Sequence, residues 1–234
     1  MIREDDSIFM SIAAFREHLL ADTLAYAFSN AKHPEKLFIG AVVQNCFGKN
    51  GIEDFCAMSD YTKYCTNGQI RVIYMHESES LGPAMARYYA SKLWGGETFF
   101  VQTDSHLKFA VDWDEKYRNE IKLTKNYPKS ILSSYPPGFE QKHFIPKGFN
   151  GTLSDINNTV VESPGCRLWE PRPSQIPFIA AGFFFTRSEI LKDIPFDPFL
   201  PWTFMGEEIS LSLRAWTHGW NMYAPRKNLI IHQY

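Results

Sequence analysis

A carboxylate and an imidazole stand two residues apart at the end of a buried, strand-like run. Asp104, Ser105 and His106 directly follow residues 97–103. Because side chains alternate between the two faces of a strand, those of Asp104 and His106 point the same way. Such a pair can hold a divalent cation, at the sheet edge where open α/β folds bind ligands. The alternative is ordinary turn chemistry, since Asp and Ser both stabilise turns.

The first half of the chain alternates apolar strands with helices, which would position this pair. Strands are expected at 8–14, 37–43, 70–75 and 99–103, with one helix at 18–29 and another opened by Gly82-Pro83 and running to 93. Continuously apolar strands are typical of a parallel sheet that is covered on both faces. The pattern predicts an α/β fold with a mostly parallel, doubly wound sheet.

The second half is less regular. It predicts helices at 114–127 and 207–217, a short helix capped by Ser188, and strands at 130–134, 178–186, 222–224 and 229–232. Residues 135–177, which include Trp169, are rich in Pro, Gly and Asn and are expected to form hairpins and loops on the ligand side of the sheet.

Composition limits the class of protein. With 44% hydrophobic and 21% charged residues the chain is globular, and a net charge of -2 argues against a dedicated nucleic-acid binder. No apolar run approaches the length of a membrane span, and the first residues lack a hydrophobic signal core. Since the cysteines show no CxxC spacing, we expect free thiols and a cytoplasmic protein; they are Cys46, Cys56, Cys65 and Cys166.

Several short motifs, in order along nearly the whole chain, resemble one enzyme family. These are the polypeptide N-acetylglucosaminyltransferases that modify hydroxyproline on a cytoplasmic ubiquitin-ligase subunit. The resemblance rests on residues 102–106, 113–114, 181–183, 197–198, 206–208, 216–219 and 231–234. It implies one glycosyltransferase domain over 1–234 with the GT-A fold, a Rossmann-like sheet flanked by helices and a smaller acceptor-side sheet. Residues 1–106 would bind the nucleotide and 107–234 the acceptor.

The resemblance also implies a metal site. His232 occupies the place of a third ligand beside Asp104 and His106, although without the family pattern a surface histidine would be the simpler interpretation. A carboxylate oxygen combined with imidazole nitrogen favours Mn²⁺ over Mg²⁺. Such a cation neutralises the charge of a departing nucleoside diphosphate.

The resemblance implies that residues at the ends of the predicted strands and at one helix start contact the nucleotide. The alternatives are that Arg16 and Glu17 simply begin a solvated helix and that Arg87 is a surface residue. The predicted nucleotide-binding residues are Ser11, Phe15, Arg16, Glu17, Gly82, Arg87, Asp104 and Ser105.

The resemblance also implies that an acidic pair after Gly206 reads the donor sugar or the acceptor hydroxyl. We assign Glu207 to the sugar hydroxyls and Glu208 to the reaction centre or acceptor, an order that could be reversed. The alternative is favourable charge at a helix N-terminus. Gly182 and Trp202 are predicted to contact the donor or acceptor sugar.

The resemblance implies a metal-dependent retaining transferase that moves N-acetylglucosamine from UDP-GlcNAc to a hydroxyl acceptor on a protein or glycan. A covalent intermediate on Glu207 or Glu208 stays open. Two other hypotheses remain: a metal-dependent nucleotide-sugar hydrolase or pyrophosphatase, and a non-catalytic module that binds sugar nucleotides.

Overall fold

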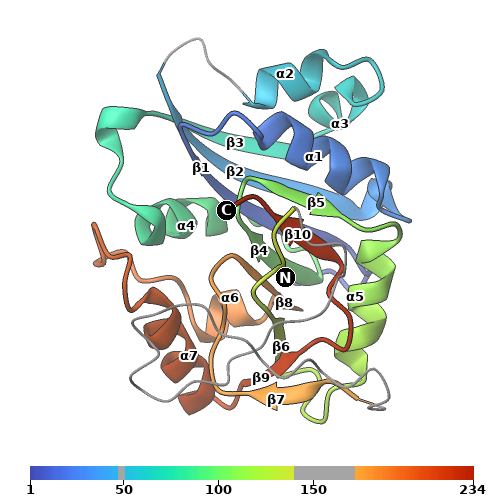
Figure 1. Ribbon diagram of the computed structural model, residues 1–234, viewed down its shortest axis with the longest axis vertical. Coiled ribbons are helices and arrows are strands. Elements are labelled where there is room, and N and C mark those ends of the chain that lie inside the picture. The colour runs from blue at the N-terminus through green and yellow to red at the C-terminus, as the bar shows by residue number, and fades with distance from the viewer. Residues whose placement is uncertain (47–50, 140–171) are drawn as a thin grey trace.

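A computed structural model describes residues 1–46, 51–139 and 172–234 (Figure 1). Its described strands form an eight-stranded sheet in the order β3-β2-β1-β4-β8-β6-β9-β7 and a two-stranded sheet, β10-β5. The main-sheet strands are β1 Ile8–Phe15, β2 Leu37–Asn45, β3 Ile70–His76, β4 Phe99–Thr103, β6 Ser130–Ser133, β7 Ser174–Ile176, β8 Phe183–Arg187 and β9 Asn221–Ala224. The smaller sheet pairs β5 Leu107–Phe109 with β10 Ile230–His232.

Helices cover both faces of the main sheet, as its apolar strands predict. The α-helices are α1 Leu20–Ser29, α2 Gly51–Ala57, α3 Thr62–Thr66, α4 Pro83–Ser91, α5 Trp113–Lys122, α6 Ile190–Asp193 and α7 Glu207–Thr217, with 3-10 turns at Pro34–Lys36 and Glu77–Glu79. One buried cluster joins α1, α2, α3 and α5 to one face, and two others join α4, α6 and α7 to the opposite face. In Figure 1, α1, α2 and α3 lie on one side of β1 to β3 and α4 on the other.

The parallel half of the sheet aligns the strand ends that carry the candidate site. β3, β2, β1 and β4 are mutually parallel, and Ile8 of β1 faces both Leu37 and Phe99. Their carboxyl ends therefore meet at one edge. β8 runs antiparallel to both β4 and β6, which places Phe183 opposite Thr103. This reversal brings the segment before β8 beside the end of β4.

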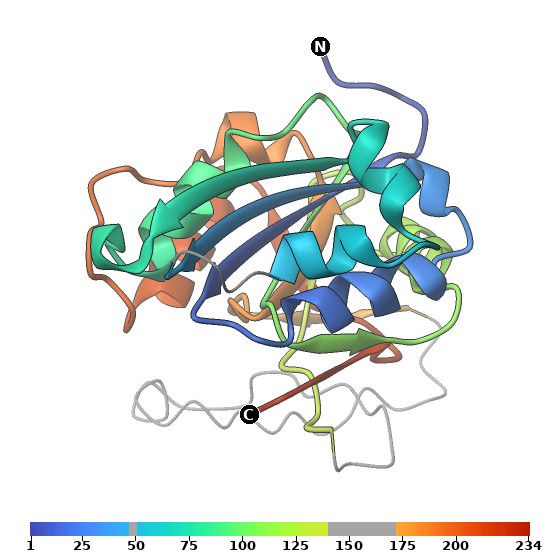
Figure 2. The same ribbon diagram turned by 90° about the horizontal axis from the view of Figure 1, so that it is seen from above.

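The small sheet lies apart from the main sheet and decides the position of the chain's last described residues (Figure 2). β5 starts immediately after His106, and β10 pairs antiparallel with it, His232 opposite Leu107. The amide of Gln233 donates to the carbonyl of His106 at 3.1 Å. Two histidines far apart in the sequence thereby become neighbours.

The structure confirms the α/β fold with a mixed, mostly parallel sheet and corrects several boundaries. The strand predicted at 178–186 begins only at Phe183, because the chain turns between Ala180 and Phe183. The helix predicted at 114–127 ends at Lys122. Just beyond this end, the Thr124 hydroxyl donates to the carbonyl of Ile121, a local side-chain bond that competes with further helical turns. The cap predicted at Ser188 is wrong, since Glu189 occupies the N-cap of α6. Helices α2 and α3 and strand β5 were not predicted.

Two cysteines differ from the prediction of free thiols. Cys56 of α2 and Cys65 of the adjoining α3 form a disulfide with a Cα separation of 6.0 Å. Short helices joined by a tight turn bring the pair into bonding range, which linear spacing does not reveal. Because disulfides persist mainly in oxidising compartments, thiol content no longer supports the cytoplasmic expectation. Cys166, Trp169 and most of the segment predicted to shape the acceptor groove lie outside the described residues.

None of the described helices combines the length and apolar character that crossing a membrane requires. The division into halves at residue 106 stays a prediction, and strands from both sides of that boundary share the main sheet.

Candidate active site

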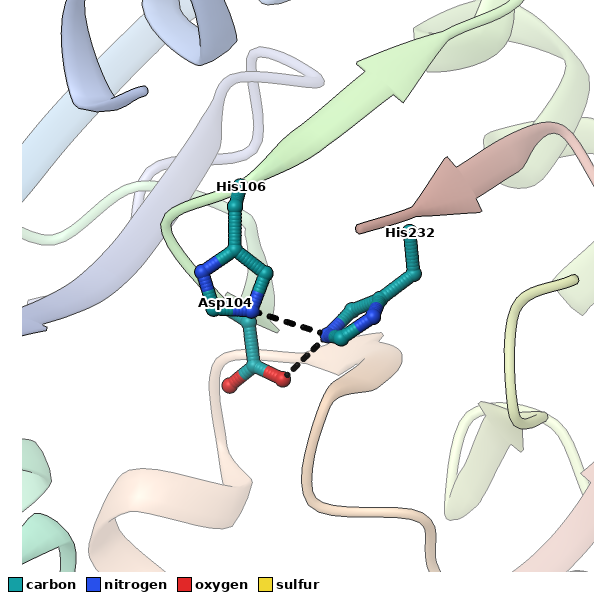
Figure 3. Close-up of side chains that lie close together, drawn as sticks. All are labelled: Asp104, His106 and His232. Carbon is teal, nitrogen blue, oxygen red and sulfur yellow. Dashed lines mark hydrogen bonds and ion pairs between the residues drawn. The ribbon is translucent and has the colours of Figure 1, made fainter. Parts of the chain in front are cut away.

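Three predicted metal ligands converge where β4, β5 and β10 meet (Figure 3). His232 Nε2 lies 3.1 Å from Asp104 Oδ2 and 3.0 Å from His106 Nε2. One ligand atom from each residue falls within 4.8 Å of the others. We call Asp104, His106 and His232 the three-donor cluster.

A missing side chain makes room for the Asp104 carboxylate. A Cβ added to Gly182 would lie 2.8 Å from Asp104 Oδ2, closer than real Cβ atoms approach an oxygen. The Asp104 amide also donates to the Gly182 carbonyl at 3.1 Å. Gly182, predicted to contact a sugar, thus also forms the surface against which Asp104 rests.

The turn that carries His106 is anchored from helix α1. The Thr23 hydroxyl donates to the Ser105 carbonyl at 2.9 Å and accepts from the Leu107 amide at 3.0 Å. His106 Nδ1 lies 2.6 Å from Glu17 Oε2, and this hydrogen bond raises the pKa of His106. Ser105 itself is buried, and its predicted contact with the nucleotide stays a prediction.

His232 is not the surface histidine that the sequence alone favours: only 7% of it is exposed. Its amide donates to the Pro137 carbonyl, its carbonyl accepts from the Phe139 amide, and its ring packs against Tyr234 at 4.3 Å between centroids. Nδ1 is buried and has no hydrogen-bond partner among the described residues. The Nε2 atom is therefore the one that faces the other two donors.

The residues of the cluster fit a divalent cation. An ionised carboxylate can only accept hydrogen bonds, so the contact with Glu17 favours a proton on Nδ1 of neutral His106 and leaves Nε2 free for a cation. Two imidazole nitrogens and a carboxylate oxygen then face one point. One oxygen and two nitrogens form a donor set that suits first-row divalent metals such as Mn²⁺.

Arg87 joins the cluster to the acidic pair. Its guanidinium bonds to both carboxylate oxygens of Glu207 and lies 3.2 Å from Asp104 Oδ1. Burial alone would raise the pKa of Asp104, but the His232 hydrogen bond and the Arg87 charge lower it to about 2. Burial prevails at Glu207, whose pKa is raised despite Arg87.

Arg87 is therefore not the surface residue of the alternative interpretation, since it is 7% exposed. Its guanidinium is engaged by two carboxylates, a role that sequence reasoning did not identify. Its predicted contact with a nucleotide stays a prediction.

Glu208 is held by two donors. One oxygen accepts from the Ala181 amide at 2.7 Å, and the other accepts from the Tyr135 hydroxyl. Burial together with the Glu208 charge raises the pKa of Tyr135. Tyr135 was not predicted; its place at the start of the Pro-rich segment was the only available signal.

These groups open on a cavity of about 220 Å³. Phe204 and Met205, neither of them predicted, contribute apolar walls. The described residues that line it are Arg87, Asp104, Tyr135, Pro136, Ala181, Gly182, Phe204, Met205, Gly206, Glu207, Glu208, Ile209, His232 and Tyr234.

Other predicted residues lie outside this lining. Ser11 is 1% exposed in the middle of β1, which gives a ligand almost no surface to contact. Phe15 is exposed at the carboxyl end of β1, and Arg16 beside it bonds to both carboxylate oxygens of Glu77 at 2.9 and 3.0 Å. Phe15 and Arg16 thus lie at this sheet edge, and their predicted contacts with the nucleotide stay predictions.

Gly82 and Trp202 contact each other through their backbones. Gly82 has a φ of +91°, and a Cβ there would lie 3.2 Å from the Trp202 Cα. The Trp202 amide donates to the Leu81 carbonyl at 2.6 Å, while 70% of Trp202 is exposed. The Trp202 side chain is not among the described residues that line the cavity, and its predicted contact with the sugar stays a prediction.

A family model described as "Glycosyltransferase (GlcNAc)" matches residues 7–60 and 43–234. The chain belongs to this GlcNAc glycosyltransferase family. That result confirms the resemblance drawn from the motifs. No curated protein matches significantly.

Solved structures of glycosyltransferases share the fold. GalNAc-T7 with UDP, GalNAc and Mn²⁺ matches with a TM-score of 0.66 and 15% identity, over 97% of this chain and 44% of that one. TarS 1-349 of S. aureus matches in complex with UDP-GlcNAc (TM-score 0.56, 14% identity, 97% and 58% coverage) and with UDP (0.58, 15%, 97% and 60%). This chain therefore spans about half the length of these neighbours, and at such identity the likeness establishes the GT-A fold alone.

Proposed function

We propose that this GlcNAc-family chain is a metal-dependent retaining glycosyltransferase. It moves N-acetylglucosamine from UDP-GlcNAc to a hydroxyl group of a protein side chain or glycan. The observation that carries the proposal is the three-donor cluster, which opens on a cavity lined by Glu207 and Glu208. Neighbours of the same fold that were solved with UDP-GlcNAc, or with UDP and Mn²⁺, support it.

Asp104, His106 and His232 would hold the cation, with Mn²⁺ preferred because two of the donors are imidazole nitrogens. When bound, a divalent metal supplies positive charge that stabilises the departing diphosphate. Arg87 contributes a fixed cation at the same place and favours the ionised form of Asp104.

The acidic pair would divide the work by its contacts. The Glu207 carboxylate lies at the start of α7, is oriented by Arg87 and faces the cavity, which suits recognition of sugar hydroxyls. Both carboxylate oxygens of Glu208 already accept hydrogen bonds, one from the Tyr135 hydroxyl and one from the Ala181 amide. Glu208 is therefore suited to position these two groups around the acceptor. In this proposal the leaving phosphate takes the acceptor's proton, and the sugar keeps its configuration.

Turnover of UDP-GlcNAc tests the proposal. Purified protein is incubated with the donor and Mn²⁺ or EDTA, and products are separated by chromatography. We expect UDP release that requires metal and is lost in Asp104→Asn. Asp112→Asn is the matched control, because this half-buried aspartate lies at the N-cap of α5 and is not among the described residues that line the cavity.

Each other outcome would overturn the proposal in a defined way. Release of UMP or a sugar phosphate would indicate the hydrolase or pyrophosphatase. Calorimetric binding of UDP-GlcNAc without turnover on any acceptor would indicate a binding module. Metal-independent turnover, or full activity of Asp104→Asn, would exclude the three-donor cluster from the reaction.

A further inference from the structure

We infer that Glu17 is a positioning residue for the metal site: its carboxylate fixes the orientation and tautomer of His106 so that Nε2 stays open to the cation. The inference rests on the proposed function in that it takes the three-donor cluster as a cation site. It assigns Glu17 a different role from the nucleotide contact that the sequence suggested.

Both oxygens of the Glu17 carboxylate are held by hydrogen bonds. Oε2 lies 2.6 Å from His106 Nδ1, and Oε1 accepts from the Leu19 amide at 2.7 Å. The side chain is 12% exposed, so water competes little for these bonds. The carboxylate therefore presents one fixed acceptor to the imidazole.

The β1–α1 turn places this acceptor. Arg16 adopts a left-handed backbone conformation with a φ of +51°, and its amide donates to the Gln44 carbonyl at 3.2 Å. The chain thereby reverses between the end of β1 and the start of α1. The Arg16 side chain pairs with Glu77, while Glu17 reaches His106.

The other side of the His106 ring explains why the tautomer matters. Nε2 lies 3.0 Å from His232 Nε2, which in turn lies 3.1 Å from Asp104 Oδ2. A proton on His106 Nε2 could donate to His232 and would occupy the space between the donors. An acceptor at Nδ1 opposes this form, because neutral imidazole carries one proton only.

A carboxylate behind a metal-binding histidine has a measurable effect in other proteins. Loss of such a partner costs roughly 10- to 100-fold in metal affinity, because the ring loses its orientation and its basicity. Glu17 contacts His106 from the side opposite to the cluster, which is where such a partner acts.

The first measurement needs no metal. Protein labelled with ¹⁵N-histidine is stripped with EDTA and recorded by two-dimensional ¹H–¹⁵N NMR at a pH well above the pKa of free imidazole. The His106 signals, assigned with His106→Gln, should report a proton on Nδ1 in the wild type. In Glu17→Ala that proton should move toward Nε2. A wild-type Nε2–H form, or identical patterns in both proteins, would overturn the inference.

The second measurement titrates Mn²⁺ alone and follows the free ion by electron paramagnetic resonance. We expect Glu17→Ala to bind Mn²⁺ roughly 10- to 100-fold more weakly, with Glu17→Gln between it and the wild type. Glu115→Gln is the matched control, since this glutamate forms a surface ion pair with Lys32. Circular dichroism confirms that each variant is folded.

The outcomes separate this inference from the proposed function. Equal Mn²⁺ affinity of wild type and Glu17→Ala overturns the role of Glu17 and leaves the metal site standing. Absence of Mn²⁺ binding in folded wild type overturns both. If Glu17→Ala instead lost affinity for UDP measured in EDTA, with unchanged Mn²⁺ binding, Glu17 would be a nucleotide ligand and the inference would be wrong. Weakened Mn²⁺ binding without any sugar transfer supports Glu17 and refutes the proposed reaction.

Discussion

Gly182→Ala should disable the proposed metal site while leaving the fold intact. The added Cβ would lie 2.8 Å from Asp104 Oδ2, whereas ordinary contact starts near 3.4 Å. The carboxylate must therefore retreat by about 0.6 Å, the difference between these distances. Its Oδ2 atom is the one that lies 3.1 Å from His232 Nε2. Because Gly182 has no positive φ, alanine is compatible with its backbone, and the cost falls on Asp104.

A displacement of this size is large for a coordination site. Misplacement by about 1 Å can cost on the order of 100-fold in rate, so we expect a fall of roughly tenfold or more in both Mn²⁺ affinity and UDP release. The unfolding free energy should change by less than about 1 kcal/mol, because the displaced atom is the end of a flexible side chain that is 27% exposed.

The assay pairs a Mn²⁺ titration with UDP-GlcNAc turnover and urea unfolding. Gly138→Ala is the matched control, since a Cβ there would lie 3.6 Å from the nearest atom, in Tyr234, which is ordinary contact. Wild-type Mn²⁺ affinity and turnover in folded Gly182→Ala would refute the reasoning. It would mean that Asp104 binds no metal or occupies another position when metal is present.

Three further predictions concern stability. Arg87→Ala leaves the buried Glu207 carboxylate unpaired and should lower the unfolding free energy by about 3–5 kcal/mol in urea titrations, whereas a loss below about 1 kcal/mol would contradict a buried ion pair. Reducing the disulfide between Cys56 and Cys65, which are nine residues apart, should cost about 2–3 kcal/mol; an unchanged urea midpoint with and without reductant would argue against the bond. The pKa of Asp193 is lowered from 3.8, chiefly by a hydrogen bond from Lys129. The ionised carboxylate therefore stabilises the folded state above pH 3.8, and this stabilisation is lost as the pH falls below that value. Asp193→Asn should therefore be less stable than wild type at neutral pH and approach it in acid, and a pH-independent difference would contradict this.

Local patterns were enough for much of the fold. Alternation and apolar runs located β1 to β4, and the glycine before Glu207 marked the start of α7, because these signals depend on neighbours along the chain. Period-two geometry likewise implied that Asp104 and His106 share a side. The family resemblance, since confirmed, added His232 to them.

The contacts within the site were decided by the tertiary structure. His232 reaches His106 across 126 positions only because β10 pairs with β5, and Gly182 meets Asp104 only because β8 runs antiparallel to β4. The roles of Glu17 and Arg87 depend on a loop turn and a helix packing that no local pattern encodes. Sheet register and packing join residues by burial and hydrogen bonding across the whole chain, so sequence spacing could propose the donors but not what holds them in place.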